Sequence, residues 1–494
     1  MKTPNPSGAL ERVLGLKEAV ALNMIDMVGI GPFIVVPLVI RAMRGPQCLL
    51  AWLGGALLAL LDGFVWSELG AAMPLAGGSY IFLREAYGAG RWGRLMSFLF
   101  VWQTLIQAPL VIASGAIGFA QYAGYLHPLG HWQEKAVSGA FVVFLVVLLY
   151  RRIGAIGKIS LLLWAGVIGT LVWLIWGGVS HFDARLAFTY PPDAWKLSPL
   201  FFAGLGAAMV STIYTYWGYY NICHLGGEIR APERNIPRGI FLSIAGIAIL
   251  YLAMQTSILG VIPWQEAQNS RFIVSTFVER LYGTRAASFA TVLVLWIAFA
   301  SVFSALLGYS RVPYSAALDG NFFSVFARVH PRKHFPHVSL LLLGSLAFLF
   351  SLLFKLATVI GAILAMRLLV QFIGQAVGVI LLRRRWPPER LPFKMWVYPL
   401  PAILTMLGWA ALFLSTGPAR KWGLLVIALG VIAFLVRARV SREWPLPRRA
   451  PLRSPHETFA SHGLAVFAGL LRGTLCRSCS RAVPAGAGHR SRAA

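Results

Sequence analysis

An apolar segment of membrane-spanning length is interrupted near its middle by residues that break helices. The segment covers residues 23–37, and Gly29, Gly31 and Pro32 lie near its centre. In lipid an unbroken helix satisfies its own backbone hydrogen bonds, so a break is tolerated only where the backbone is buried in protein or lines a cavity. The segment therefore predicts a membrane transporter with a binding site at the break.

The composition indicates a polytopic membrane protein. Of 494 residues, 58% are hydrophobic and 12% are charged, and the mean hydropathy is +0.70. A soluble domain carries a charged fraction of about 25%. Apolar stretches of spanning length, about 20 residues, recur along the chain. We predict an all-α membrane protein with twelve spans, near residues 18–42, 47–70, 95–123, 136–150, 156–178, 200–226, 238–262, 287–312, 337–354, 356–382, 396–415 and 420–437.

The net charge of +27 suggests nucleic acid, but its distribution favours membrane topology. Lys and Arg are more abundant in the loops that share a side with the termini, so we expect both termini in the cytoplasm, no nucleic-acid partner, and insertion in the plasma or inner membrane. The predicted organisation is an N-terminal segment at 1–17, a membrane domain at 18–437 and a basic, disordered tail at 438–494.

A second interruption occurs where an inverted repeat requires one. The sixth predicted span contains Tyr-Trp-Gly-Tyr-Tyr at residues 216–220. Paired interruptions in two five-span halves indicate the central site of a transporter. Glycine alone is weaker evidence, because membrane helices use it for close packing, and we read Gly54 and Gly55 in that way. Pro32 favours a true break in the first span, since it removes a backbone donor.

Several stretches, in order, resemble the amino acid-polyamine-organocation permeases over residues 10–437. They are the glycine-rich break at 29–33, the proline-glycine-glycine-tyrosine loop at 73–88, the acidic, proline-punctuated segment at 228–238 and the loop at 310–337. The resemblance implies two inverted five-helix repeats plus two C-terminal helices, with the first and sixth helices broken. It also implies transport of amino acids or related organic amines.

The first break offers donors for a substrate carboxylate. Backbone amides at Ile30, Gly31 and Phe33 would lie at the positive end of a half-helix, and Gly29 and Gly31 would let a ligand approach closely. The resemblance implies the same role for this segment.

The second break offers acceptors for a substrate ammonium. Carbonyl groups released around Tyr216, Trp217, Gly218 and Tyr219 would accept hydrogen bonds from it. The resemblance implies that Tyr214 acts as an aromatic gate over the substrate. Ordinary aromatic packing is the alternative for Tyr214, and stacking on a cationic ligand is a third interpretation.

Asp26 lies one helical turn before the first break. An acid inside a membrane indicates function, so Asp26 would bind a substrate amine or carry a proton. The alternative is a carboxylate that is hydrogen-bonded to neighbouring helices. Relatives often carry an uncharged residue here, so Asp26 departs from the family pattern.

Arg367 also lies within a predicted span, and its role is unassigned from the sequence.

Lys158 opens the fifth predicted span, and two interpretations stay open. It is either a loop lysine of the positive-inside pattern or, as the resemblance implies, a cation that bridges the first and eighth helices in proton-coupled or sodium-independent relatives. Ser301 and Ser304 share a face of the eighth span and would complete that region. Local hydrogen bonding is the alternative for both serines.

Motifs for enzymes and cofactors are missing from the sequence. It contains no G-x-x-x-x-G-K-[ST] and no H-E-x-x-H, so we expect neither direct use of ATP nor any cofactor or metal. The pair Cys476 and Cys479 has no second pair of ligands. We predict a secondary permease, coupled to protons or acting by exchange, and not an enzyme. A polyamine or cationic amino acid carrier and a non-transporting nutrient sensor stay as alternatives.

Overall fold

The computed structural model describes residues 10–90, 92–151, 153–354, 363, 366–441 and 444–445. The chain divides into units of residues 1–436 and 437–494, and the fold below concerns the first unit. The predicted tail from residue 446 onward, with Cys476 and Cys479, lies outside the described residues, as does most of the first half of the tenth predicted span.

Helices make up the regular structure of the described chain, with isolated bridges at Leu14–Ile229 and Ala76–Leu225 as its only β pairing. In the first half they are α1 (Leu16–Met27), α2 (Gly31–Met43), η1 (Pro46–Cys48), α3 (Leu49–Ala72), α4 (Ser79–Tyr87), α5 (Trp92–Ala123), α6 (His131–Leu149), α7 (Ile153–Ser180), α8 (Ala184–Ala187), α9 (Pro199–Tyr216), α10 (Asn221–His224) and η2 (Gly226–Glu228). In the second half they are α11 (Pro232–Leu259), α12 (Trp264–Ala267), α13 (Ile273–Tyr282), α14 (Thr284–Tyr309), α15 (Arg311–Leu318), η3 (Ser324–Ala327), α16 (His337–Leu353), η4 (Leu368–Ile373), α18 (Gly374–Arg385), η5 (Pro388–Arg390), α19 (Leu400–Ser415) and α20 (Ala419–Ser441).

The described helices confirm a polytopic all-α membrane protein. Eight are long and apolar enough to cross a membrane, and the bent pair α1 and α2 brings the number to nine. The shorter helices α16 and α19 are also apolar. Each of the twelve spans predicted from the sequence overlaps a described helix, while the number of crossings stays a prediction.

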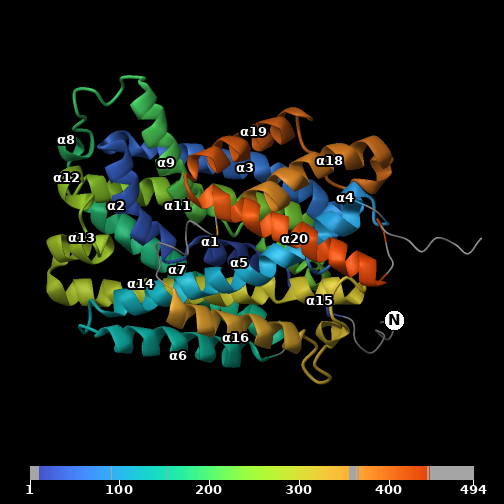
Figure 1. Cartoon of the computed structure of the whole chain (residues 1–494). Helices are drawn as coiled ribbons and strands as arrows, with labels where there is room; N and C mark the ends of the chain where they lie inside the picture. The colour runs from blue at the N-terminus through green and yellow to red at the C-terminus, as the bar shows by residue number, and fades with distance from the viewer. Residues whose placement is uncertain are drawn as a thin grey trace, which may run out of the picture. The chain divides into compact units, whose positions relative to one another are not determined.

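The first predicted span is two helices, α1 and α2, whose axes meet at 46°. α1 stops at Met27, and α2 begins at Gly31 with Pro32 in its first turn. Proline is well tolerated there, because the first amides of a helix have no partner within it and the fixed φ angle suits a helical start. Both segments are blue in Figure 1. The sequence Gly-Ile-Gly-Pro thus ends one helix and starts another.

The second break lies between α9 and α10, at residues 217–220. Gly218 has a φ of +123°, a backbone conformation that residues with a Cβ rarely adopt. A Cβ at this position would lie 2.7 Å from the carbonyl carbon of Asp26 and from the amide nitrogen of Met27. The second break is therefore pressed against the end of α1.

Asn23 fixes the two breaks to each other. Its side-chain amide donates to the carbonyl oxygen of Tyr219, and its Oδ1 accepts from the amide of Ile222 at 3.0 Å. Around these segments, α1 packs against α7, α11 and α14, and α2 packs against α9. The long helices α5 and α14 run side by side in Figure 1 and are in contact. The broken helices are thereby enclosed by continuous ones, which keeps their free backbone groups away from lipid.

Candidate functional site

A small cavity lies between the two helix breaks. Its volume is about 70 Å³, enough for several water molecules or part of a small ligand. Residues of α1, α2, α5, α9 and α14 and of the two breaks line it. Of the site residues predicted from the sequence, those that line it are Asp26, Gly29, Ile30, Gly31, Tyr214, Trp217, Gly218 and Ser301.

Two backbone amides at the start of α2 are available to a ligand. Within the described ranges, no backbone acceptor is found for the amides of Ile30 and Gly31. The amide of Phe33 instead donates to the carbonyl oxygen of Ile30 at 3.2 Å, and the Phe33 side chain is buried away from the cavity. The prediction that Phe33 offers a free donor is therefore wrong for this structure. The other two amides lie at the positive end of α2 and suit a carboxylate.

The aromatic residues of the second break point in different directions. Tyr214 and Trp217 line the cavity, and the Tyr214 hydroxyl lies 3.3 Å from the Ser114 hydroxyl. Tyr216 packs edge-on against aromatic rings of α3 and α11 instead. The Tyr219 hydroxyl donates to a buried carboxylate of α3, and its carbonyl is already hydrogen-bonded to Asn23. The structure therefore brings Tyr214 and Trp217 to the cavity, but not the side chains of Tyr216 and Tyr219.

The carbonyl group of Trp217, which lines the cavity, stays available to a ligand, whereas Tyr216 does not line the cavity. No hydrogen-bond donor to either carbonyl oxygen is found in the part of the chain that the structure describes. Both carbonyls lie at the C-terminal end of α9, where the helix no longer supplies donors. An ammonium group in the cavity would satisfy the carbonyl of Trp217.

The two serines of α14 differ in their surroundings. Ser301 lines the cavity, and its hydroxyl donates to the Asp26 carbonyl oxygen at 3.4 Å. Ser304 is buried behind the cavity. Its hydroxyl donates to the Leu22 carbonyl oxygen at 2.7 Å and accepts from the Asn221 side-chain amide at 2.7 Å. Ser304 therefore joins α1, α10 and α14, and it does not line the cavity.

Lys158 lies apart from these residues. It is exposed near the start of α7, it does not line the cavity, and no hydrogen bond or ion pair to a described residue is found for it. α7 does pack against both α1 and α14. The structure does not bring the Lys158 side chain between them.

Several lining residues were missed or left unassigned by the sequence analysis. Tyr220 and Tyr309 add aromatic surface, Thr215 and Ser114 add hydroxyl groups, and Arg367 adds a buried guanidinium. Arg367 was recognisable as a charge within an apolar span. Tyr220 belongs to the second break that the sequence indicated, but nothing in the sequence distinguishes Tyr309, Thr215 or Ser114 from ordinary packing residues.

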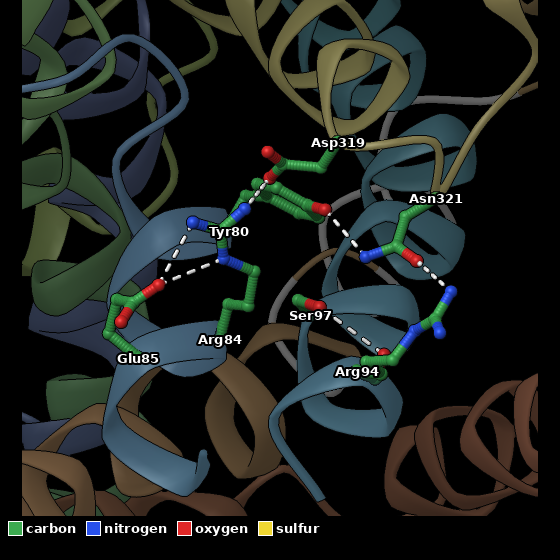
Figure 2. Close-up of polar contacts among 7 residues, drawn as sticks. All are labelled: Tyr80, Arg84, Glu85, Arg94, Ser97, Asp319 and Asn321. Atoms are coloured by element: carbon green, nitrogen blue, oxygen red, sulfur yellow. Dashed lines mark hydrogen bonds and ion pairs between the residues drawn. The ribbon is translucent and has the colours of Figure 1, made fainter. Parts of the chain in front are cut away.

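Polar contacts tie α4 and α5 to the segment after α15 (Figure 2). Arg84 of α4 forms an ion pair with Asp319. Asn321 donates to the Tyr80 hydroxyl at 2.7 Å and accepts from Arg94 at 3.3 Å. These bonds close one end of the bundle through loops that are far apart in sequence.

A buried ion pair lies in the same group of loops. Glu228 and Arg311 are 2.7 Å apart and almost fully buried. Burial raises the pKa of the Glu228 carboxyl, while the Arg311 guanidinium opposes the rise. The Glu228 backbone carbonyl also accepts from the amides of Val13 and Leu14. The loop after α10 therefore holds both the start of α15 and the segment before α1.

Comparison with known proteins agrees with this architecture. A family model described as amino acid permease matches residues 14–435. The chain is 27% identical over 409 residues to the mouse (Mus musculus) cationic amino acid transporter 4, a match that covers 77% of this chain and 61% of the relative. It is 25% identical to the serine/threonine exchanger SteT of Bacillus subtilis, covering 81% of this chain and 90% of that protein. The branched-chain amino acid permease BcaP of the same organism is 23% identical, covering 87% and 94%.

Proposed function

The chain belongs to the amino acid permease family, and on that premise we propose that it is a secondary transporter that moves amino acids by alternating access. The observation that carries the proposal is the cavity between two facing helix breaks, where free backbone donors lie on one side and the free carbonyl group of Trp217 on the other. Such a site binds a zwitterion through neutral backbone groups, which allows release as well as binding.

A substrate would lie across the two breaks. Its carboxylate would accept from the amides of Ile30 and Gly31, and its ammonium would donate to the carbonyl oxygen of Trp217. Asp26 would add a negative charge near the ammonium. Tyr214 would cover the ligand as a gate, because its ring lines the cavity and its hydroxyl is held near α5.

Transport would be driven by a proton gradient or by exchange. Asp26 is the carboxylate that faces the cavity, so it is the first residue to test as a proton carrier. Coupling through Lys158 stays a prediction that needs its own variant, because the side chain lies outside the cavity. Ser301 and Ser304 would transmit the state of α1 to α14 through their hydrogen bonds to its carbonyl groups.

The protein would span the plasma or inner membrane with both termini in the cytoplasm. This orientation follows from the excess of Lys and Arg on one side of the predicted spans. The transporter would leave its substrates chemically unchanged. Its partners would be the substrate, a proton and the surrounding lipid.

The test is uptake of radiolabelled amino acids and polyamines into proteoliposomes, with and without an inward proton gradient. Wild type is compared with Asp26→Asn and Lys158→Ala. We expect saturable uptake of at least one amino acid by the wild type, and loss of gradient stimulation in Asp26→Asn if Asp26 carries the proton. Loss of stimulation only in Lys158→Ala would move that role to Lys158. Binding without uptake or exchange would refute transport and favour a nutrient sensor.

A carrier of polyamines or cationic amino acids is the second candidate. Asp26 and the aromatic rings of Tyr214, Trp217 and Tyr220 favour it, because carboxylates and aromatic faces attract cations. Arg367 weighs against it, since its guanidinium would repel a second positive charge in the same cavity. Uptake of lysine or putrescine in preference to neutral amino acids would establish this candidate.

A further inference from the structure

Arg367 presents a buried guanidinium to the cavity. The residue is 1% exposed, and it immediately precedes the π-helical turn η4. Its guanidinium carbon lies 4.7 Å from the ring centre of Trp217, 5.1 Å from that of Tyr220 and 5.7 Å from that of Tyr309. Aromatic faces stabilise a cation in such a cage. They leave its hydrogen-bond donors to be satisfied by other groups.

The hydrogen bonds of Arg367 are incomplete. Its Nε donates to Gln371 Oε1 at 2.9 Å, while Nη2 is buried and has no hydrogen-bond partner among the described residues. No carboxylate lies within ion-pair distance in the described ranges. A buried charge is costly unless it is paired and hydrogen-bonded. The open donor, in a side chain that lines the cavity, indicates that an anionic group enters from the cavity.

The charges that face the cavity come from three directions. Asp26 on α1 presents a carboxyl group, the first turn of α2 is the positive end of a helix, and Arg367 is positive. The aromatic rings around Arg367 are those of Trp217, Tyr220, Tyr309 and Phe372, none of which carries a charge at neutral pH. A ligand that matches this arrangement carries one positive and two negative groups.

We propose that Arg367 binds a side-chain carboxylate of the substrate, so that acidic amino acids are the substrate class of this site. The inference rests on the proposed function, in which the start of α2 takes the α-carboxylate and the second break takes the ammonium. The side-chain carboxylate of glutamate or aspartate then accepts a hydrogen bond from Nη2 of Arg367. Arginine suits this task, because its planar fork binds a carboxylate through two hydrogen bonds.

The test uses full-length protein in proteoliposomes and compares glutamate with glutamine, which has nearly the same shape but no side-chain charge. Each competes with uptake of whichever labelled neutral amino acid the wild type accumulates. We expect glutamate to compete about ten- to a hundredfold better than glutamine, the ratio of a charged to a neutral hydrogen-bonded pair. Arg367→Gln should remove this preference, measured as the ratio of the two inhibition constants, and Arg367→Lys should retain part of it.

Arg280→Gln is the matched control. Arg280 pairs with Glu266 at the surface, away from the cavity, so this variant should keep the wild-type preference. Equal competition by glutamate and glutamine in the wild type overturns the inference, and this comparison requires no variant to fold. An equal loss of uptake of every substrate in Arg367→Gln also overturns the inference, because it would assign Arg367 to binding of the α-carboxylate or to packing. In both cases uptake of a neutral amino acid by the wild type leaves the proposed function intact. Failure of the wild type to take up any amino acid refutes that function.

Discussion

Replacement of Gly218 by alanine tests whether the two helix breaks must touch. The added Cβ would lie 2.7 Å from backbone atoms of Asp26 and Met27, whereas carbon atoms ordinarily approach to about 3.5–4.0 Å. The end of α1 would have to move by about 1 Å to restore that contact distance. The first break comes directly after the end of α1. Displacement of α1 would therefore also change the spacing of the amides and carbonyl groups that face the cavity.

The cost can be estimated from two separate contributions. Overpacking costs about 1–3 kcal/mol, and a φ of +123° in a residue with a Cβ adds about 1–2 kcal/mol. We therefore expect Gly218→Ala to lose about 2–5 kcal/mol of unfolding free energy. Substrate affinity should also fall, because the ligand groups of the two breaks move apart.

Two control variants separate these contributions. Gly283 has a φ of +81°, and a Cβ there would have no atom within 4 Å, so Gly283→Ala carries only the conformational cost. Gly169 is helical with open space around it, and Gly169→Ala should be neutral or slightly stabilising. The assay is thermal denaturation of purified protein in detergent, followed by substrate binding. If Gly218→Ala is as stable as Gly283→Ala and binds substrate like the wild type, the close contact between the breaks is not required.

Three further substitutions probe contacts outside the cavity. Glu68→Gln should lower the unfolding free energy by about 3 kcal/mol, because it leaves the bidentate Arg383 without its buried carboxylate; a thermal midpoint like that of the wild type would contradict this. Tyr219→Phe removes a donor to a buried carboxylate and should lower the unfolding free energy by about 1–3 kcal/mol. The KM for uptake should stay near the wild-type value, because the side chain does not line the cavity. Asp319→Asn breaks the partly exposed pair with Arg84 and should change stability by less than about 1 kcal/mol; a large drop in the thermal midpoint would show that this network stabilises the fold far more than such pairs do.

The membrane class and the two breaks were predictable, because they depend on local properties of the chain. Long apolar runs are stable as helices in lipid wherever they occur. Gly29, Gly31 and Pro32 together favour an interruption of such a run, because proline lacks an amide hydrogen and glycine lacks a Cβ. The structure places the end of α1 and the start of α2 at these residues.

The direction of individual side chains was less predictable. Tyr214, Tyr216, Trp217 and Tyr219 look equivalent in the sequence, yet two of them line the cavity and two point toward neighbouring helices. Tyr214 and Tyr216 lie two residues apart in the last turn of α9 and therefore face different sides of that helix. Within the break at residues 217–220 the backbone follows no helical period, so sequence spacing does not say which face a residue occupies. The same limit applies to Phe33, whose amide is used inside α2.

The sequence by itself determined that this protein is a helical membrane protein with paired breaks, since hydropathy and helix breaking are properties of contiguous residues, and its motifs resemble those of a permease family. Only the tertiary structure decided which groups meet at the cavity. It brought Arg367 to the site, although the sequence left its role open, and it left Lys158 outside. The physical reason is that the surroundings of a buried charge depend on how distant helices rotate and pack, and that packing depends on contacts between residues hundreds of positions apart.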